Sequence, residues 1–269
     1  MAYLLRTKDN PLDPGRSVDQ NQGVDNETFL YDNLQTEIAS YDAHRPSAAV
    51  GAASDEFNST ALNVAWTAVG IASGTVSFLE TGAVDEYDLA TFPGWLAFQT
   101  DDNGNSVNLS TIAVRKAWAP GTGPWSVIAR VTALNLSQTD KNQAIGIMVS
   151  DDTTPTNYTN LTWGMESTGD RRILFRNQGG NIVDDTVEDD ERHYYLALVR
   201  ETAGGTTAAW ASYDGLGWFK IGTTATATAV AYLWIGILQQ TPTVRPIYMC
   251  DFIRTFATAT LTCGRGGNT

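Results

Sequence analysis

The chain has 269 residues, 42% of them hydrophobic, which is enough to bury a sizeable core in one large domain or two smaller ones. Lys and Arg total 17 against 30 Asp and Glu, so the net charge is −13 and the basic surface of a nucleic-acid-binding protein is excluded. The acidity also disfavours adsorption to anionic membranes, and no apolar run is long enough to span a bilayer.

Residues 1–53 are predicted to form an N-terminal anchoring arm. Pro11, Pro14 and Gly15 deny regular structure to its opening, and Asp25-Asn26-Glu27 then marks the start of a short helix that Pro46 stops. The helix has a single apolar stripe, made of Phe29, Leu30, Leu34, Ile38 and Tyr41. One such helix is not stable alone, so it must pack on its own β domain, on copies of itself or on a partner.

The first residues lack the apolar core of a signal peptide, so we expect the chain to be made in a cytoplasm and not to be exported by that route. Cys250 and Cys263 are too few for a disulfide framework or a metal cage. Cys250 lies in a predicted strand and is expected to be a small core residue.

Residues 54–256 are predicted to be an all-β body, and 257–269 a flexible C-terminal tail. Leu161 and Trp163 alternate with Asn160 and Thr162, the pattern of a half-buried strand. Many short strands with turns between them are typical of a two-sheet sandwich. The expected strands are 75–80, 94–100, 107–115, 125–134, 144–150, 158–166, 172–177, 193–201, 206–213, 218–222, 231–238 and 247–256.

The pair Asp214-Gly215 separates two apolar runs and predicts a β-hairpin. Asp-Gly supplies the positive φ angles that a tight hairpin needs, and the second strand is expected to open on Trp218.

Four stretches of the body, in chain order, resemble the concanavalin A-like jelly roll of lectins, laminin G-type modules and accessory domains of glycoside hydrolases. They are Asp55-Glu56-Phe57-Asn58 followed by Trp66, then 144–149, then 195–201 with 212–222, and finally 250–256. The resemblance implies an all-β, two-sheet antiparallel jelly-roll sandwich, here preceded by an extended N-terminal arm with one short helix. It does not extend to residues 1–53.

Jelly-roll endoglucanases of this kind place nucleophile and general acid on one strand, in a pattern such as E-x-D-x-x-E. The nearest stretch here, Asp85-Glu86-Tyr87-Asp88, lacks the third acid and is expected in a loop. His44 and His193 have no partners that the sequence selects. We therefore expect no enzymatic activity, no catalytic residues and no cofactor.

Two acidic segments could hold calcium but have simpler interpretations. Residues 184–191 carry six acids, which usually mark a solvated loop. Residues 101–105, Asp-Asp-Asn-Gly-Asn, offer oxygen ligands beside a glycine, but that composition is also ordinary hairpin chemistry. The expectation is a loop and a turn, with no metal.

The chain has eight tryptophans, and flat aromatic rings are the side chains on which sugars stack. Trp66, Trp163, Trp218 and Trp234 occupy positions that favour the core, whereas Trp118 and Trp125 flank a loop tip, where a side chain can be exposed. For any single tryptophan, core packing is the favoured interpretation. The candidate carbohydrate face consists of Trp118, Tyr158, Arg176 and Trp210.

The architecture favours a bacteriophage virion structural protein, such as a capsid decoration, head-fibre or tail component assembled in the host cytoplasm. The arm would bind other virion proteins of the capsid or tail, ordering as it binds, and the lectin-like sandwich would project. A homo-oligomer is expected, three-fold being the natural symmetry for a fibre-like protein, without nucleic acid or membrane as a partner. The alternative is a carbohydrate-binding module that recognises host or environmental glycans.

Overall fold

The computed structural model describes residues 53–259 and 261, with gaps at 75, 77–84, 101–108, 135, 137–140, 166–170, 179, 187–192, 226, 241–244 and 260. All of these residues belong to one compact unit, Ala48–Cys263. The predicted helix of the arm, with its apolar stripe from Phe29 to Tyr41, lies outside the described residues, as does most of the predicted tail.

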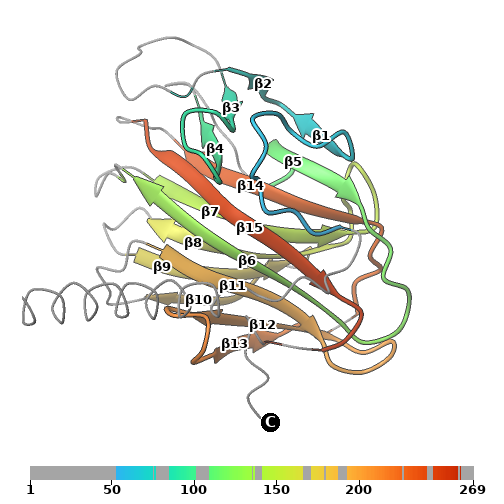
Figure 1. The fold of residues 1–269 in the computed structure, drawn as a ribbon. Coiled ribbons are helices and arrows are strands. Elements are labelled where there is room, and N and C mark those ends of the chain that lie inside the picture. The colour runs from blue at the N-terminus through green and yellow to red at the C-terminus, as the bar shows by residue number, and fades with distance from the viewer. Residues whose placement is uncertain are drawn as a thin grey trace, which may run out of the picture. The chain divides into compact units, whose positions relative to one another are not determined.

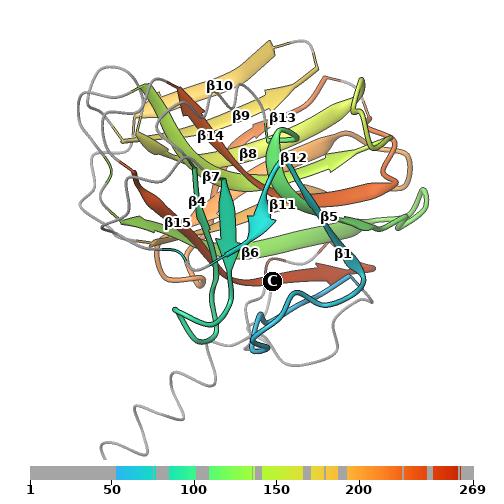
Figure 2. The same ribbon diagram turned by 90° about the horizontal axis from the view of Figure 1, so that it is seen from above.

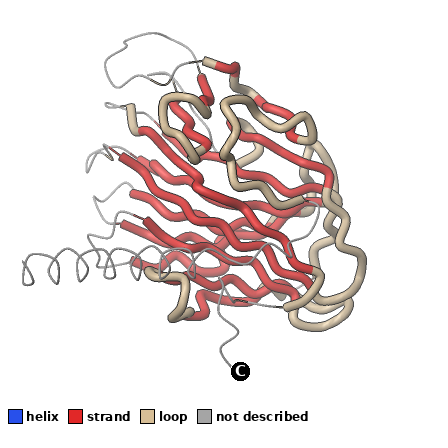
Figure 3. Tube along the Cα trace, viewed as in Figure 1, coloured by secondary structure: helices blue, strands red, loops and turns tan. Residues whose placement is uncertain are grey.

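The described residues form two sheets and contain strands, loops and turns but no helix (Figures 1 and 3). The seven-stranded sheet has the order β1 (Trp66–Val69), β5 (Ile112–Ala117), β14 (Tyr232–Gln240), β7 (Lys141–Ser150), β8 (Tyr158–Met165), β9 (Arg171–Asn177) and β10 (Gly180–Thr186). The eight-stranded sheet has the order β13 (Phe219–Thr223), β12 (Thr207–Ser212), β11 (His193–Arg200), β6 (Trp125–Leu134), β15 (Ile247–Phe256), β4 (Leu96–Gln99), β3 (Glu86–Asp88) and β2 (Ala72–Ser73).

Neighbouring strands run antiparallel except β2 and β3, which pair in parallel. The two sheets lie face to face as the layers of a sandwich (Figure 2). This confirms the predicted all-β, two-sheet fold.

Two acidic segments that were expected to be loops contain strands. Residues 86–88 form β3, with Tyr87 packed against the core. Asp88 ends that strand by accepting hydrogen bonds from the backbone N–H groups of Ala90 and Thr91, at 2.9 and 2.8 Å. The acidic run begins inside β10, which continues to Thr186 because its backbone pairs with β9 as far as Arg172. The predicted strand 75–80, apart from Val76, and the turn 101–105 lie outside the described residues.

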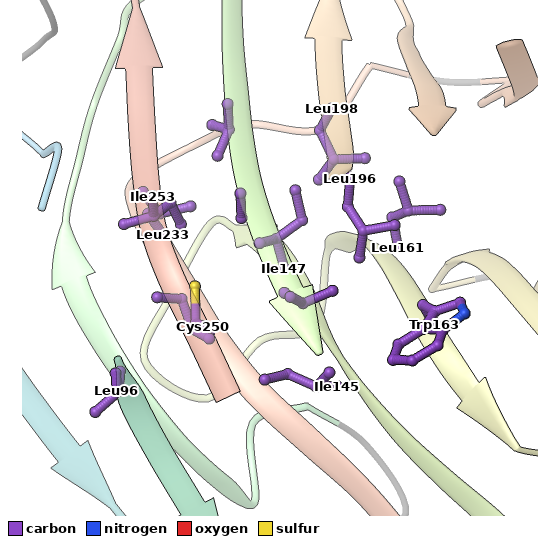
Figure 4. Packing of buried hydrophobic residues seen from close by; sticks show 14 of the residues in the cluster. Leu96, Ile145, Ile147, Leu161, Trp163, Leu196, Leu198, Leu233, Cys250 and Ile253 are labelled. Atoms are coloured by element: carbon purple, nitrogen blue, oxygen red, sulfur yellow. The ribbon is translucent and has the colours of Figure 1, made fainter. Parts of the chain in front are cut away.

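Alternating side chains from both sheets fill the space between the layers. Figure 4 shows this packing around Ile145, Ile147, Leu161, Trp163 and Cys250, which confirms Cys250 as a core residue. Burial of a side chain of this size stabilises the fold by about 1.5–3 kcal/mol.

The rings of Trp163 and Tyr194, one from each sheet, have centroids 5.2 Å apart. Trp125, which was expected near an exposed loop tip, is fully buried in the same core. Trp125 is the first residue of β6, and its side chain points inward. The alternation of side chains along the strand, and not the neighbouring loop, decides its burial.

The first described residues are tied to the last strand. Asp55 forms an antiparallel bridge with Ile253, and its carboxylate accepts a hydrogen bond from the Trp66 indole at 2.9 Å. The Glu56 carboxylate accepts hydrogen bonds from Nε and Nη2 of the Arg254 guanidinium, at 2.5 and 2.6 Å. Paired, bidentate contacts of this kind fix orientation as well as position, so Asp55 and Glu56 are held against β15 in a defined orientation.

One end of the sandwich is organised around a buried cation. The Arg200 guanidinium lies 5.1 Å above the Trp125 ring and donates hydrogen bonds to the carbonyl oxygens of Gly121 and Thr228, which belong to two different loops. Desolvation lowers the pKa of Arg200 from its usual value. The carbonyl dipoles and the indole face therefore hold this charge inside the protein and fix both loops.

The close approach of β7 and β8 at Gly146 generates a stability prediction. A Cβ at this position would lie 2.2 Å from the Leu161 carbonyl oxygen, a backbone atom that cannot move aside cheaply. We expect Gly146→Ala to lower the free energy of unfolding by about 1–3 kcal/mol. Gly123→Ala is the matched control, because no atom lies within 4 Å of its Cβ. Equal melting temperatures for the two variants would contradict the register of β7 and β8.

Candidate functional site

The structure divides the four candidate carbohydrate residues between different surfaces. Tyr158 on β8 and Arg176 on β9 share the outer face of the seven-stranded sheet. Trp210 on β12 points outward from the eight-stranded sheet, since its neighbours Ala209 and Ala211 face the core. Trp118 follows β5 and packs edge-on against Trp125, with centroids 5.3 Å apart and the rings at 78°. Only Tyr158 and Arg176 come together.

Four polar side chains form a cluster on the outer face of the seven-stranded sheet: Tyr158, Arg176, Asn160 and Asn181. Arg176 stands opposite both asparagines in the register and donates from Nε to the Asn181 Oδ1 at 2.7 Å. Asn160 is 1% exposed, and its Oδ1 has no hydrogen-bond partner in the structure. An unpaired buried polar atom costs about 1–3 kcal/mol, so this oxygen is available to a donor only if the side chains around it move.

On the other half of this outer face, around β5 and β14, the aromatic surface is covered by other side chains. Trp234 is fully buried there, and its indole N–H donates to the Ser150 hydroxyl at 2.7 Å. The Arg115 guanidinium lies 5.3 Å from the Trp234 ring and donates to the Thr153 carbonyl at 3.0 Å. Trp234 is therefore buried as predicted, but in a small cluster on the outer face and not between the sheets.

The outer face of the eight-stranded sheet carries an aromatic and apolar cluster, and cations cover much of it. Arg130 lies 5.3 Å from the Trp95 ring and 5.8 Å from the Tyr195 ring, and it forms an ion pair with Asp251 at 3.0 Å. Arg254, paired with Glu56, lies 4.7 Å from the Phe252 ring. Stacked, paired cations of this kind shield aromatic surface from water.

The β12–β13 hairpin is less covered. We define the hairpin patch as Trp210, Leu216, Trp218 and Lys220. Leu216 is 55% exposed, both tryptophans are half-buried, and the Lys220 ammonium lies 5.6 Å from the Trp210 ring. Trp218 was expected in the core but lies on the outer side, because the inward position of this strand is taken by Phe219.

The loop that carries this patch is held by its own hydrogen bonds. The Ser212 hydroxyl accepts from the Gly215 N–H at 2.9 Å, and the Asp214 Oδ1 accepts from the N–H groups of Leu216 and Gly217 at 2.8 and 2.9 Å. Gly215 has a φ of +75°, as the Asp-Gly signal predicts. The loop comprises the six residues 213–218, between the end of β12 at Ser212 and the start of β13 at Phe219, and is therefore longer than a two-residue turn.

Within the described ranges, no group of three or more His, Cys, Asp and Glu side chains is arranged to hold a metal ion. The candidate turn 101–105 lies outside those ranges, as do His44 and the end of the acidic run. No helix in the described part of the chain has the length and apolar character needed to cross a membrane.

No protein-family model and no curated protein matches this chain. Among solved structures, the GH43 protein BlXynB of Bacillus licheniformis matches with a TM-score of 0.54 and 15% identity, over 79% of this chain and 40% of that one. A bifunctional GH43-CE protein of Bacteroides eggerthii matches with a TM-score of 0.55 and 13% identity, over 77% of this chain and 26% of that one. The chain thus spans well under half the length of these proteins.

The CBM2 module of the evolved Dit of Lactobacillus casei phage J-1 covers 75% of this chain and 94% of its own, with 11% identity and a TM-score of 0.47, a likeness too weak to carry an argument. The stronger matches show that a β-sandwich of this fold occurs in proteins of carbohydrate metabolism. They show the fold alone, because identity is so low.

The comparisons overturn one expectation. The missing E-x-D-x-x-E pattern led to the prediction of a protein without enzymatic activity, yet the matching structures include several GH43 glycoside hydrolases. The absence of one family's motif excludes only the chemistry of that family, so the conclusion drawn from it was wrong.

Asp214 generates a prediction on pH dependence. Hydrogen bonds, the strongest from the Leu216 N–H, lower the pKa of Asp214 below its ordinary value of 3.8. A lowered folded pKa stabilises the protein above the unfolded pKa, and this contribution is lost as the pH falls through the folded pKa. We expect Asp214→Asn to melt at a lower temperature than the wild type at pH 7, with the gap closing below about pH 3.8. A gap that stays constant from pH 7 to pH 3 would contradict this role of the carboxylate.

Proposed function

We propose that this protein is a structural component of a bacteriophage virion, anchored to the capsid or tail by residues 1–53 and displaying a concanavalin A-like sandwich. In this proposal the chain assembles in the host cytoplasm as a homo-oligomer. Its partners are other virion proteins, which bind the apolar stripe from Phe29 to Tyr41.

The observation that carries the proposal is that the described strands of both sheets supply a large buried core of their own. The apolar stripe of residues 29–41 is a separate apolar surface in the sequence. A stripe of that kind needs a surface to cover it, and a partner protein supplies one.

The junction supports the same proposal. The Asp55 bridge to Ile253 and the Glu56–Arg254 ion pair hold the start of the sandwich against β15. An arm attached at this point would present the sandwich in a defined orientation on a particle. A loosely tethered module would not need such a connection.

The alternative function is recognition of host or environmental glycans by the sandwich. The observation that favours it is the gathering of exposed apolar side chains on the β12–β13 hairpin, since exposed apolar patches mark ligand and partner surfaces. The two functions are compatible, because attachment uses residues 1–53 and recognition uses the outer face of the sandwich.

Substitutions on the stripe test the attachment. We expect Leu34→Asp or Ile38→Asp to reduce incorporation into purified particles by at least about tenfold, because a carboxylate in an apolar contact is not solvated. Thr36→Asp, on the opposite side of the predicted helix, is the matched control and should be incorporated normally. The measurement is the amount of the chain in purified particles relative to the soluble fraction, with the melting temperature as a check on folding. Full incorporation of both stripe variants would contradict the proposal.

A further inference from the structure

Exposed apolar surface is concentrated at one place on the described sandwich. Among the described residues, the large hydrophobic side chains that are exposed are Val64, Tyr213 and Leu216. Two of these three lie in the loop between β12 and β13. The ring of Tyr213 turns inward, with its centroid 4.9 Å from that of Tyr194. Leu216, in the same loop, is 55% exposed, and the two half-buried tryptophans of the hairpin patch lie next to this loop or at its end in the sequence.

The side chains of the two half-buried tryptophans lie on the same face and expose carbon atoms only. Trp210 pairs with Lys220 and Ala211 with Phe219, so Trp218 is the diagonal cross-strand neighbour of Trp210 on the same face. The Nε1 atoms of both tryptophans are buried and have no hydrogen-bond partner. The exposed part of each side chain is therefore carbon, which suits contact with the C–H face of a ring and not hydrogen bonding through the indole.

Lys220 adds a polar group beside these rings. Its side chain is exposed and its ammonium lies over Trp210, and none of the described acids forms an ion pair with it. An ammonium group has three donors and no acceptor, so it can donate to a hydroxyl or a carboxylate oxygen on a ligand that rests on the indoles.

The patch is preorganised. The hydrogen bonds of Ser212 and Asp214 hold the loop. Gly215 packs closely against Tyr195, because a Cβ on Gly215 would lie 3.0 Å from the Tyr195 ring. Little conformational entropy is therefore lost when a ligand binds, which favours weak ligands of small contact area.

We propose that the hairpin patch binds an oligosaccharide, with pyranose rings stacked on Trp210 and Trp218 and a sugar hydroxyl or carboxylate held by Lys220. This inference rests on glycan recognition, the alternative function given above, and places the glycan site on the eight-stranded sheet. The polar group at Tyr158 and Arg176 is a poorer site, because Asn160 is buried and Arg176 is already bonded to Asn181. A protein partner would need about 800 Å² of surface on each side, more than one hairpin offers.

The experiment uses the full chain on an array of neutral oligosaccharides and oligosaccharides that contain uronic acids, followed by titration calorimetry with the best ligand. We expect Trp210→Ala and Trp218→Ala each to weaken binding by about tenfold. Trp210→Phe and Trp218→Phe keep a flat ring and should stay within a few-fold of the wild type. If Lys220 contacts a carboxylate, Lys220→Glu should weaken the binding of acidic oligosaccharides more than that of neutral ones. If Lys220 contacts a hydroxyl, the affinity for both classes should fall alike.

The control variants are Tyr158→Ala and Arg176→Ala on the other sheet, which should bind normally. Wild-type affinity in both tryptophan-to-alanine variants, or loss of binding in Arg176→Ala alone, would overturn the assignment of the site. Failure of the wild type to bind any oligosaccharide on the array would overturn the inference and the glycan alternative together. Because incorporation into particles depends on residues 1–53, it is measured separately and would be unaffected by either result.

Discussion

Mutual burial of the inward faces of two sheets is the constraint on which the rest of this structure depends. Through the middle of strands such as β6, β7 and β11, alternate side chains are apolar and pack against the other layer, as Trp163 of β8 and Tyr194 of β11 do. Because side chains alternate along a strand, this requirement also decides which residues face outward. The hairpin patch is a consequence: with Phe219 turned inward, Trp218 must lie outside.

The outward faces carry apolar clusters, and the protein covers them in several ways. Guanidinium groups stack on Trp95, Tyr195, Phe252 and Trp234. Beyond β15 the chain also contributes, because Leu261 packs against the cluster on the eight-stranded sheet. Among the described residues, Lys220 is the cation that lies over a ring of the hairpin at the edge of that sheet, and both tryptophans there stay half-buried, which is the basis of the proposed ligand site.

Much of the fold could be predicted from the sequence, because alternation and turn residues are local signals. The bounds of β6 and β15 agree with the predicted strands, and the Asp-Gly turn has its positive φ at Gly215. The strands β3 and β10 were missed, since their pairing with β4 and β9 overrides an acidic composition. Such pairing is a tertiary effect that a single segment does not reveal.

The site was harder to predict for a related reason. Strand alternation places a residue on one side of its own sheet but does not say which outer faces coincide, so Tyr158 and Trp210 were grouped although they belong to different sheets. The exposure of Trp218 was also hidden, because an outward tryptophan and a core tryptophan have the same local pattern. The absence of a catalytic motif was informative about one family only, as the glycoside hydrolase matches show.

In the proposed function the sandwich supplies rigidity, and residues 1–53 supply association. Light scattering coupled to size-exclusion chromatography tests this division most directly, on the full chain and on a variant that lacks residues 1–53. The account predicts an oligomer for the full chain and a folded monomer for the variant, with the same near-ultraviolet circular dichroism. An oligomer that persists without residues 1–53, or a variant that no longer folds, would contradict it.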